Sequence, residues 1–303
     1  MSSPTRGGCD HPEAHAAGED FLPVAVTDEE LASLASLEKT REELEAIRSE
    51  INVFGEDPAE VAVRVLKEHQ ILGLGEMHLS RDGHRKLGAR LMPALREAGA
   101  THLALEVSRW VQPALDEFER SGQLDRGELP CLLADDEFLD ILESARHAGI
   151  KLVAADNRPE QRRDAAGHTI AAEPALVDQP RELVWDEHMA FAIGQILDSD
   201  PAAKVVFWVG NMHLLDHRGQ GRLITAARLL RQRFKLCTVM GADRAYTSCS
   251  LVRLTKNLRR AVAVSTSKAE QIKQFCRGTP AGPVCEPFGC WDYIFIYPPV
   301  RRH

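Results

Sequence analysis

Four short apolar runs, each followed at once by polar residues, constrain the fold of this chain most. The runs are residues 71–75, 103–105, 152–155 and 205–210, and the segments between them carry apolar residues at helical spacing. Short apolar runs separated by helices predict buried strands joined by crossover connections. The pattern predicts an α/β fold with a mainly parallel sheet that is covered by helices on both faces.

The residues that follow the four runs are unusually rich in ionisable groups. They are Glu76 and His78 after the first run, Glu106 after the second, Asp156 after the third, and Asn211 and His213 after the fourth. Any one of them alone is most simply read as the chain returning to water. Ligands of open α/β sheets bind outside the carboxyl ends of the strands, so the set as a whole predicts one polar site there.

The residue types in this set fit two kinds of chemistry. A carboxylate beside an imidazole, as in Glu76 and His78, is typical of a first-row metal site and equally of a metal-free general base. His213 is expected to be a second ligand or a second acid or base, and Glu106 either ligates or orients an imidazole. If a metal is bound, these four residues are its predicted ligands, and Zn, Mn, Fe or Ni is the expected ion.

Further residues near the strand ends are candidates for substrate binding. They are Arg109, Asp156, Arg158, His84 and Asn211. A surface position is the alternative for each arginine, and a plain turn is the alternative for Asp156. Asp186 and His188 fall in a long helix near residues 178–199, where charged residues most often form the solvated face.

Composition and motifs argue against several classes of partner and indicate a cellular location. A formal charge of -8 argues against nucleic acid or an anionic membrane. No apolar run is long enough to span a bilayer, and residues 1–20 lack the apolar segment of a secretory signal, so a cytoplasmic location is expected. An odd number of cysteines, seven, favours reduced thiols. The nucleotide-binding patterns GxGxxG and GxxxxGK[ST] are absent, which disfavours nucleotide binding by either of these loops. The expected partner is a small-molecule or peptide substrate.

The chain divides into three parts by pattern. Residues 1–22 resemble a flexible tail, and residues 23–56 form a predicted helical extension. Its helix is expected to open at Thr27, with Glu30 completing a capping box, and to run to about residue 50. This helix would cover the sheet or pair subunits in a homodimer. Residues 57–303 are predicted to form a single α/β domain.

Taken together, these motifs resemble a known group, the superfamily that joins erythromycin esterases, ChaN-like haem-binding proteins and the Tiki/TraB proteins. The resemblance runs from Leu72 to about Pro299. It rests on the segments Leu74-Gly75-Glu76-Met77-His78, Leu105-Glu106, Asp186 with Met189-Ala190, 207–213, Trp291-Asp292-Tyr293 and Pro298-Pro299. The single residue between Glu76 and His78 is similar to the ChaN-like branch.

The resemblance implies an α/β sheet with Glu76, His78, Glu106 and His213 lining a cleft at the strand ends. Members are associated with ester hydrolysis, metal-dependent peptide cleavage or haem binding, so two functions are predicted. The first is a hydrolase of esters, lactones or amides in which His78 activates a water. The second is a haem or tetrapyrrole binding protein with a His or Tyr as axial ligand. An aromatic content of 6%, with three Tyr, favours the hydrolase.

Overall fold

The computed structural model describes residues 40–76, 83–124, 136–156, 162–163, 169–170, 181–216, 224–242, 254–255, 258–279 and 282–298. Its elements are α3 (Arg41–Phe54), α4 (Pro58–Glu68), β1 (Ile71–Glu76), α5 (His84–Glu97), β2 (His102–Ser108), η1 (Arg109–Val111), α6 (Gln112–Ser121), α7 (Asp136–Ala148), β3 (Lys151–Asp156), β4 (Arg162–Arg163), β5 (Thr169–Ile170), α8 (Arg181–Ser199), β6 (Val205–Gly210), η3 (Asn211–Leu214), α9 (Ala226–Arg231), β7 (Leu236–Ala242), β8 (Val262–Ser265), α11 (Glu270–Lys273), β9 (Cys276–Thr279), β10 (Gly282–Pro287), η5 (Phe288–Cys290) and β11 (Tyr293–Ile296).

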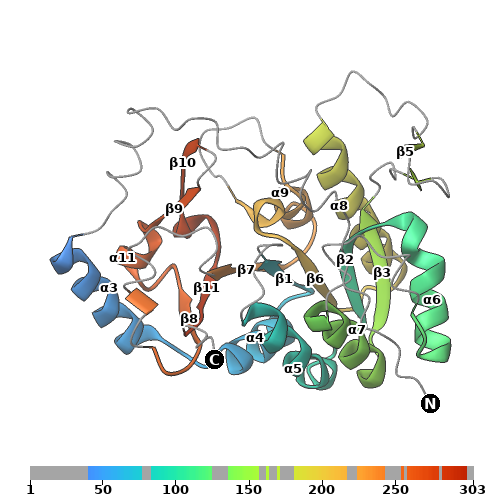
Figure 1. The fold of residues 1–303 in the computed structure, drawn as a ribbon, viewed down its shortest axis with the longest axis horizontal. Coiled ribbons are helices and arrows are strands. Elements are labelled where there is room, and N and C mark those ends of the chain that lie inside the picture. Colours follow the sequence, from blue (N-terminus) through green and yellow to red (C-terminus); the bar gives the residue numbers. More distant parts are fainter. Residues whose placement is uncertain are drawn as a thin grey trace, which may run out of the picture.

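Seven strands form one sheet in the order β3-β2-β6-β1-β7-β11-β8 (Figure 1). All neighbouring strands are parallel except β8, which runs antiparallel to β11 at one edge. The four apolar runs are therefore confirmed as strands, and they are the consecutive neighbours β3, β2, β6 and β1. Because these four strands are parallel, their carboxyl ends lie along one edge of the sheet.

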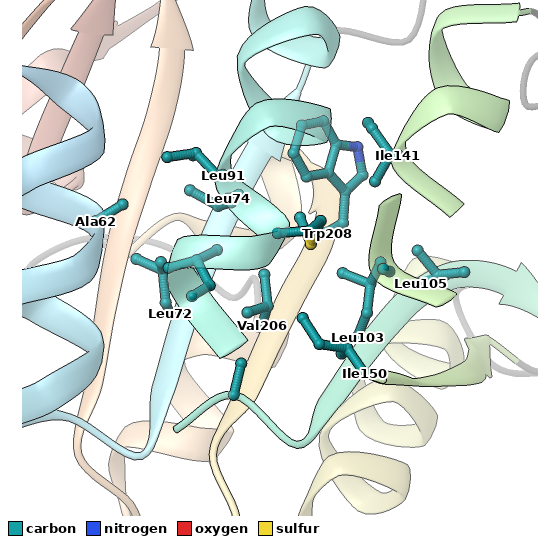
Figure 2. Packing of buried hydrophobic residues seen from close by; sticks show 14 of the residues in the cluster. Ala62, Leu72, Leu74, Leu91, Leu103, Leu105, Ile141, Ile150, Val206 and Trp208 are labelled. Carbon is teal, nitrogen blue, oxygen red and sulfur yellow. The ribbon is translucent and has the colours of Figure 1, made fainter. Parts of the chain in front are cut away.

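Helices cover both faces of the sheet, as the sequence predicts. Alternate residues of each strand point to opposite faces, and two hydrophobic clusters result. The first cluster joins the sheet to α4, α5, α6 and α7, and Figure 2 shows part of it around Trp208 of β6. The second cluster joins the opposite face to α3, α8 and α9. We call these the α5 face and the α8 face.

The N-terminal extension differs from the predicted helix. The backbone of Thr40 is extended, with φ -62° and ψ 169°, and its side chain caps a helix that begins at Arg41. Glu43 completes the capping box, so the cap lies at Thr40 for this helix. A continuous helix through residue 40 is therefore wrong, and Thr27 lies outside the described residues. The expected covering role is borne out, because Leu44, Ile47 and Ile51 are buried in the α8-face cluster.

Two further predictions differ in extent. The helix expected over residues 220–233 is confined to α9, six residues long, within the described part of that segment. The sequence analysis does not predict the edge strand β8, although its short apolar run Val262-Ala263-Val264 is buried. No helix among the described residues is long and apolar enough to cross a membrane.

Candidate active site

A buried cluster of three ionisable side chains lies at the carboxyl edge of the sheet on the α8 face. Glu106 comes from β2, His213 from η3 directly after β6, and Asp186 from α8. The Nδ1 atom of His213 lies 3.0 Å from Asp186 Oδ1, and its Nε2 atom lies 3.4 Å from Glu106 Oε1. The imidazole is thus held between two carboxylates that come from distant parts of the chain.

The two carboxylates are fixed by backbone donors as well as by the imidazole. The Gly210 N–H donates to Glu106 Oε2 at 2.7 Å, and the Ala226 N–H donates to Asp186 Oδ1 at 2.6 Å. The second bond ties the start of α9 to α8 through Asp186. Because backbone hydrogen bonds fix both carboxylates, they also fix the position of the imidazole ring between them.

Exposure within the cluster is uneven. The side chain of His213 is 15% exposed, against 4% for Glu106 and 9% for Asp186. The imidazole is therefore the member of the cluster that is best placed to meet a ligand from solvent.

The surroundings of His213 favour its protonated form. Burial by itself would lower the pKa of the imidazole, but the hydrogen bonds to Asp186 and Glu106 outweigh that effect and raise the pKa to about 10. His213 is therefore an imidazolium at neutral pH. A cationic donor of this kind is suited to stabilise a developing oxyanion or to protonate a leaving group, and it is not suited to act as a general base.

A second polar cluster occupies the α5 face, and it contains Glu76. Arg85 of α5 donates to both oxygens of Glu76, through Nε at 2.9 Å and Nη2 at 2.7 Å. Trp208 Nε1 donates to the same carboxylate at 2.8 Å. Arg85 and Glu76 have side chains only 1% and 2% exposed, so this is a fully buried, bidentate ion pair.

The prediction that Glu76 joins Glu106 and His213 in one set is not met by this geometry. Glu76 lies two residues after Leu74 and so points to the same α5 face, whereas Glu106 points to the α8 face. A position after a strand predicts that a residue lies at the carboxyl edge of the sheet, but it does not predict which face of the sheet the side chain points to. His78, the fourth residue of the predicted set, lies outside the described residues.

His84 is also part of the α5-face cluster. Its Nδ1 atom lies 2.6 Å from the Tyr297 hydroxyl, and its ring packs against Trp208 with centroids 4.8 Å apart. Burial lowers the pKa of His84 to about 4, with Glu76 opposing and Arg85 adding to that shift, so the imidazole is neutral at neutral pH. A direct contact with substrate is not supported for a side chain this deeply buried.

The other predicted substrate-binding residues differ in solvent exposure. Arg109 is exposed in η1, directly after β2, whereas Asp156 and Asn211 are each 1% exposed. Asn211 packs over Gly75, where an added Cβ would come within 2.4 Å of the Asn211 Oδ1 atom. Arg158 lies outside the described residues.

Two surface cavities lie away from the His213 cluster. One, of about 600 Å³, lies between α5 and α7, and the other, of about 520 Å³, lies beside the start of β7.

Asp186 is buried in this cluster, in contrast to the solvated position that its helix predicts. It was expected on the solvated face of its helix, but it is 6% exposed and hydrogen-bonded to His213. The apolar residues Met189, Ile193 and Leu197 of α8 are buried. Their helical spacing from residue 186, at three, seven and eleven positions, is the signal that places Asp186 on the same inward face.

Glu76, Glu106 and His213 of the predicted metal set are described, and they do not have the arrangement of a metal site; the fourth predicted ligand, His78, lies outside the described residues. No group of three or more His, Cys, Asp or Glu side chains in the described part of the chain has the arrangement of a metal site. Both nitrogens of His213 face carboxylates at hydrogen-bond distance, and the Glu76 carboxylate binds Arg85 on both oxygens. We therefore derive no chemical step through a metal.

No protein-family model and no curated protein matches the chain. Among solved structures it is similar to a succinoglycan biosynthesis protein, with 12% identity, a TM-score of 0.64 and coverage of 86% of this chain and 98% of that chain. It is also similar to a Bacillus cereus protein, with 11% identity, a TM-score of 0.56 and coverage of 83% and 96%. A toxin effector domain from Vibrio vulnificus aligns at 22% identity and a TM-score of 0.44.

The first two similarities extend over most of this chain and nearly all of the two matched chains, and they concern the fold alone. They support the α/β fold that the sequence predicts. The alignment to the toxin structure covers 62% of this chain and spans only 36% of that chain, and a TM-score below 0.5 carries no argument about shared activity.

Proposed function

We propose that the chain is a hydrolase of the erythromycin esterase and ChaN-like type, which cleaves an ester, lactone or amide. The observation that carries this proposal is the buried Glu106–His213–Asp186 cluster at the carboxyl edge of a parallel sheet. An imidazolium held between two anchored carboxylates, with its ring partly open to solvent, is an arrangement suited to acyl transfer.

In the proposed reaction, a water oxygen adds to the carbonyl carbon while the carbonyl π electrons move to oxygen. His78, which follows β1 by two residues, takes the proton from the water, as the sequence predicts. The imidazolium of His213 stabilises the resulting oxyanion. When the carbon–oxygen or carbon–nitrogen bond breaks, the leaving group takes the electron pair and the Nε2 proton of His213. Solvent then returns the proton from His78 to His213.

The remaining residues have supporting roles in this proposal. Glu106 faces the Nε2 atom of His213 and holds the proton there until a substrate oxygen or nitrogen competes for it. Asp186 is a positioning residue, because it contacts the Nδ1 atom on the far side of the ring and orients it. Glu76 holds the end of β1 against α5 through Arg85 and takes no part in proton transfer.

The test is a screen of 4-nitrophenyl esters, lactones and peptide amides with wild type, His213→Ala and Glu106→Gln. We expect each variant to fold and to lose roughly 100-fold or more in kcat on any substrate that the wild type consumes. The matched control is His147→Ala, which removes an exposed histidine on α7 and should keep full activity. Full activity in both site variants would place the reaction elsewhere.

Asp186→Asn tests the positioning role separately. It should lower kcat and shift the pH profile to lower pH, because the amide no longer stabilises the imidazolium. A purely structural role would change stability without moving the profile.

The same preparations decide the cofactor question that the resemblance raises. Elemental analysis and an absorption spectrum of protein purified without chelator would reveal a stoichiometric metal or a haem Soret band. A Soret band with no hydrolysis of any substrate would replace the hydrolase proposal with tetrapyrrole binding.

A further inference from the structure

The outer edge of β3 is covered by side chains of α6. β3 is the terminal strand in the order of the seven-stranded sheet, so one of its edges faces β2 and the other faces away from the sheet. α6 lies beside this outer edge (Figure 1). An uncovered strand edge presents N–H and C=O groups that a strand of another chain can bind. The contact between α6 and these groups therefore determines whether the edge is open to a partner.

Three hydrogen bonds join α6 to the outer edge of β3. The Ala154 N–H donates to Gln112 Oε1 at 2.7 Å, and Gln112 Nε2 donates to the Leu152 carbonyl oxygen at 3.0 Å. The Leu152 N–H donates to Glu119 Oε1. Backbone groups of alternate residues point to opposite edges of a strand, so Leu152 and Ala154 both point outward. Side chains of a helix therefore occupy outward groups that a neighbouring strand would otherwise bind.

The carboxamide of Gln112 takes the place of a peptide group of a neighbouring strand. It supplies an acceptor and a donor on one planar group, as a peptide group does. Gln112 Nε2 also donates to Asp116 Oδ1 at 2.8 Å, one turn further along α6, and this bond fixes the orientation of the amide. Leu115 and Phe118 of the same helix are buried in the α5-face cluster. α6 thus packs through its apolar side chains and closes the edge with its polar ones.

The opposite edge of the sheet is closed in a different way. Glu56, two residues after α3, forms an antiparallel bridge with Ala263 of β8, and both N–H···O bonds of the bridge are 2.9 Å long. Backbone groups make that contact, and any residue other than proline supplies them. At β3 the contact depends on two particular side chains, so a substitution can remove it.

We propose that Gln112 and Glu119 prevent β3 from pairing, edge to edge, with β3 of a second copy of this chain. A second copy is the expected partner because every molecule carries the same edge, and two antiparallel β3 strands related by a two-fold axis would join two sheets into one. α6 leaves the edge only in local unfolding events, which its hydrogen bonds to β3 keep rare. Without these bonds the open form is frequent enough for pairing to capture it. The inference concerns assembly and does not depend on the proposed function.

Amide hydrogen exchange measured by NMR tests the contact at single residues. In Gln112→Ala, the Ala154 N–H should exchange about tenfold faster than in the wild type, because it loses its acceptor. The Lys151 N–H donates to the Thr101 carbonyl oxygen at 2.9 Å, on the β2 side of the strand, and should keep its rate. Alanine favours the helical backbone, so α6 itself should remain. An unchanged Ala154 rate, or an equal rise at both amides, would overturn the proposal.

Sedimentation velocity across a dilution series tests the assembly. The double variant Gln112→Ala/Glu119→Ala should form a dimer as its concentration rises. The Ala154 N–H should then become protected again, because a partner strand accepts from it. In the wild type, the exchange rate of this amide should not depend on concentration. The control is Glu117→Ala, which removes an exposed carboxylate of α6 that pairs with Arg120 of the same helix, and it should behave as the wild type does.

Three results of this second experiment would overturn the proposal. The first is a double variant that stays monomeric at every concentration. The second is a dimer in which the Ala154 N–H stays unprotected, because the contact then lies elsewhere. The third is a wild type that gains the same protection on association, because the α6 side chains then do not close the edge. If the double variant fails to fold, Glu119→Ala decides the same question through sedimentation and the exchange of the Leu152 N–H.

Discussion

His213 and His84 have pKa values displaced in opposite directions, although both are histidines near the same edge of the sheet. His213 faces two carboxylates, which raise its pKa above the usual range despite its burial. His84 is buried against Trp208 with a neutral partner, Tyr297, so burial dominates and its pKa falls. Burial therefore decides the protonation of His84, whereas at His213 the two carboxylates together outweigh burial.

The raised pKa of His213 predicts a stability that depends on pH. The folded protein holds a proton that the unfolded chain releases above its ordinary value of 6.5, so the stabilisation is complete below pH 6.5 and is lost as pH rises toward about 10. Urea unfolding across this interval should show a falling free energy in the wild type and a flatter curve in His213→Gln. His84→Gln should keep the decrease in unfolding free energy above pH 6.5, because the lowered pKa of His84 affects stability only below that pH. Parallel curves for wild type and His213→Gln would contradict the assignment.

The buried pair of Glu76 and Arg85 predicts a large effect of removing one partner. Arg85→Met leaves a buried carboxylate without its guanidinium, which typically costs about 3–5 kcal/mol of folding free energy. The matched control is Arg41→Met, because the Arg41–Glu45 pair is exposed, at 80% and 56%, and should change stability by about 0.5 kcal/mol or less. Urea unfolding measures both. A loss below about 1 kcal/mol for Arg85→Met would show that Glu76 is not a structural carboxylate.

Among the helices, α5 packs close to the sheet because it has a glycine, Gly88, at the point of contact. A Cβ added to Gly88 would lie 2.5 Å from Cη2 and Cζ3 of Trp208, so the helix can approach β6 only without a side chain there. The indole that fills this contact also donates to Glu76. The packing of α5 and the buried polar cluster on its face therefore depend on the same tryptophan.

Gly88→Ala should therefore destabilise the protein by about 1–3 kcal/mol through overpacking. Gly194→Ala is the control within another helix, α8, where the added Cβ would meet only the end of Arg233 at 3.2 Å and the Phe234 ring at 3.8 Å. It should be neutral, or stabilising by up to about 1 kcal/mol, because alanine favours the helical backbone. Thermal unfolding of the two variants compares them directly. Equal effects would mean that helix propensity, not the Trp208 contact, governs Gly88.

For the whole molecule, the sheet and its order explain why distant residues meet. Glu106, Asp186 and His213 are separated by many residues in the chain, yet β2 and β6 are neighbours and α8 packs on the α8 face beside them. A parallel sheet sends all crossover connections over its faces, so each face acquires its own layer of helices and its own polar cluster. One edge of the sheet thus carries two separate polar clusters.

The sequence by itself determined the fold class, the four parallel strands and three residues at their carboxyl ends, Glu76, Glu106 and His213. Short apolar runs and helical spacing are local properties, so they can be read without knowing what packs where. Only the tertiary structure decided that Glu76 pairs with Arg85 on one face and that Asp186 joins His213 on the other. Both facts depend on the face to which a strand residue points and on the helix that covers it. Those are contacts between segments far apart in the chain, and no local pattern specifies them.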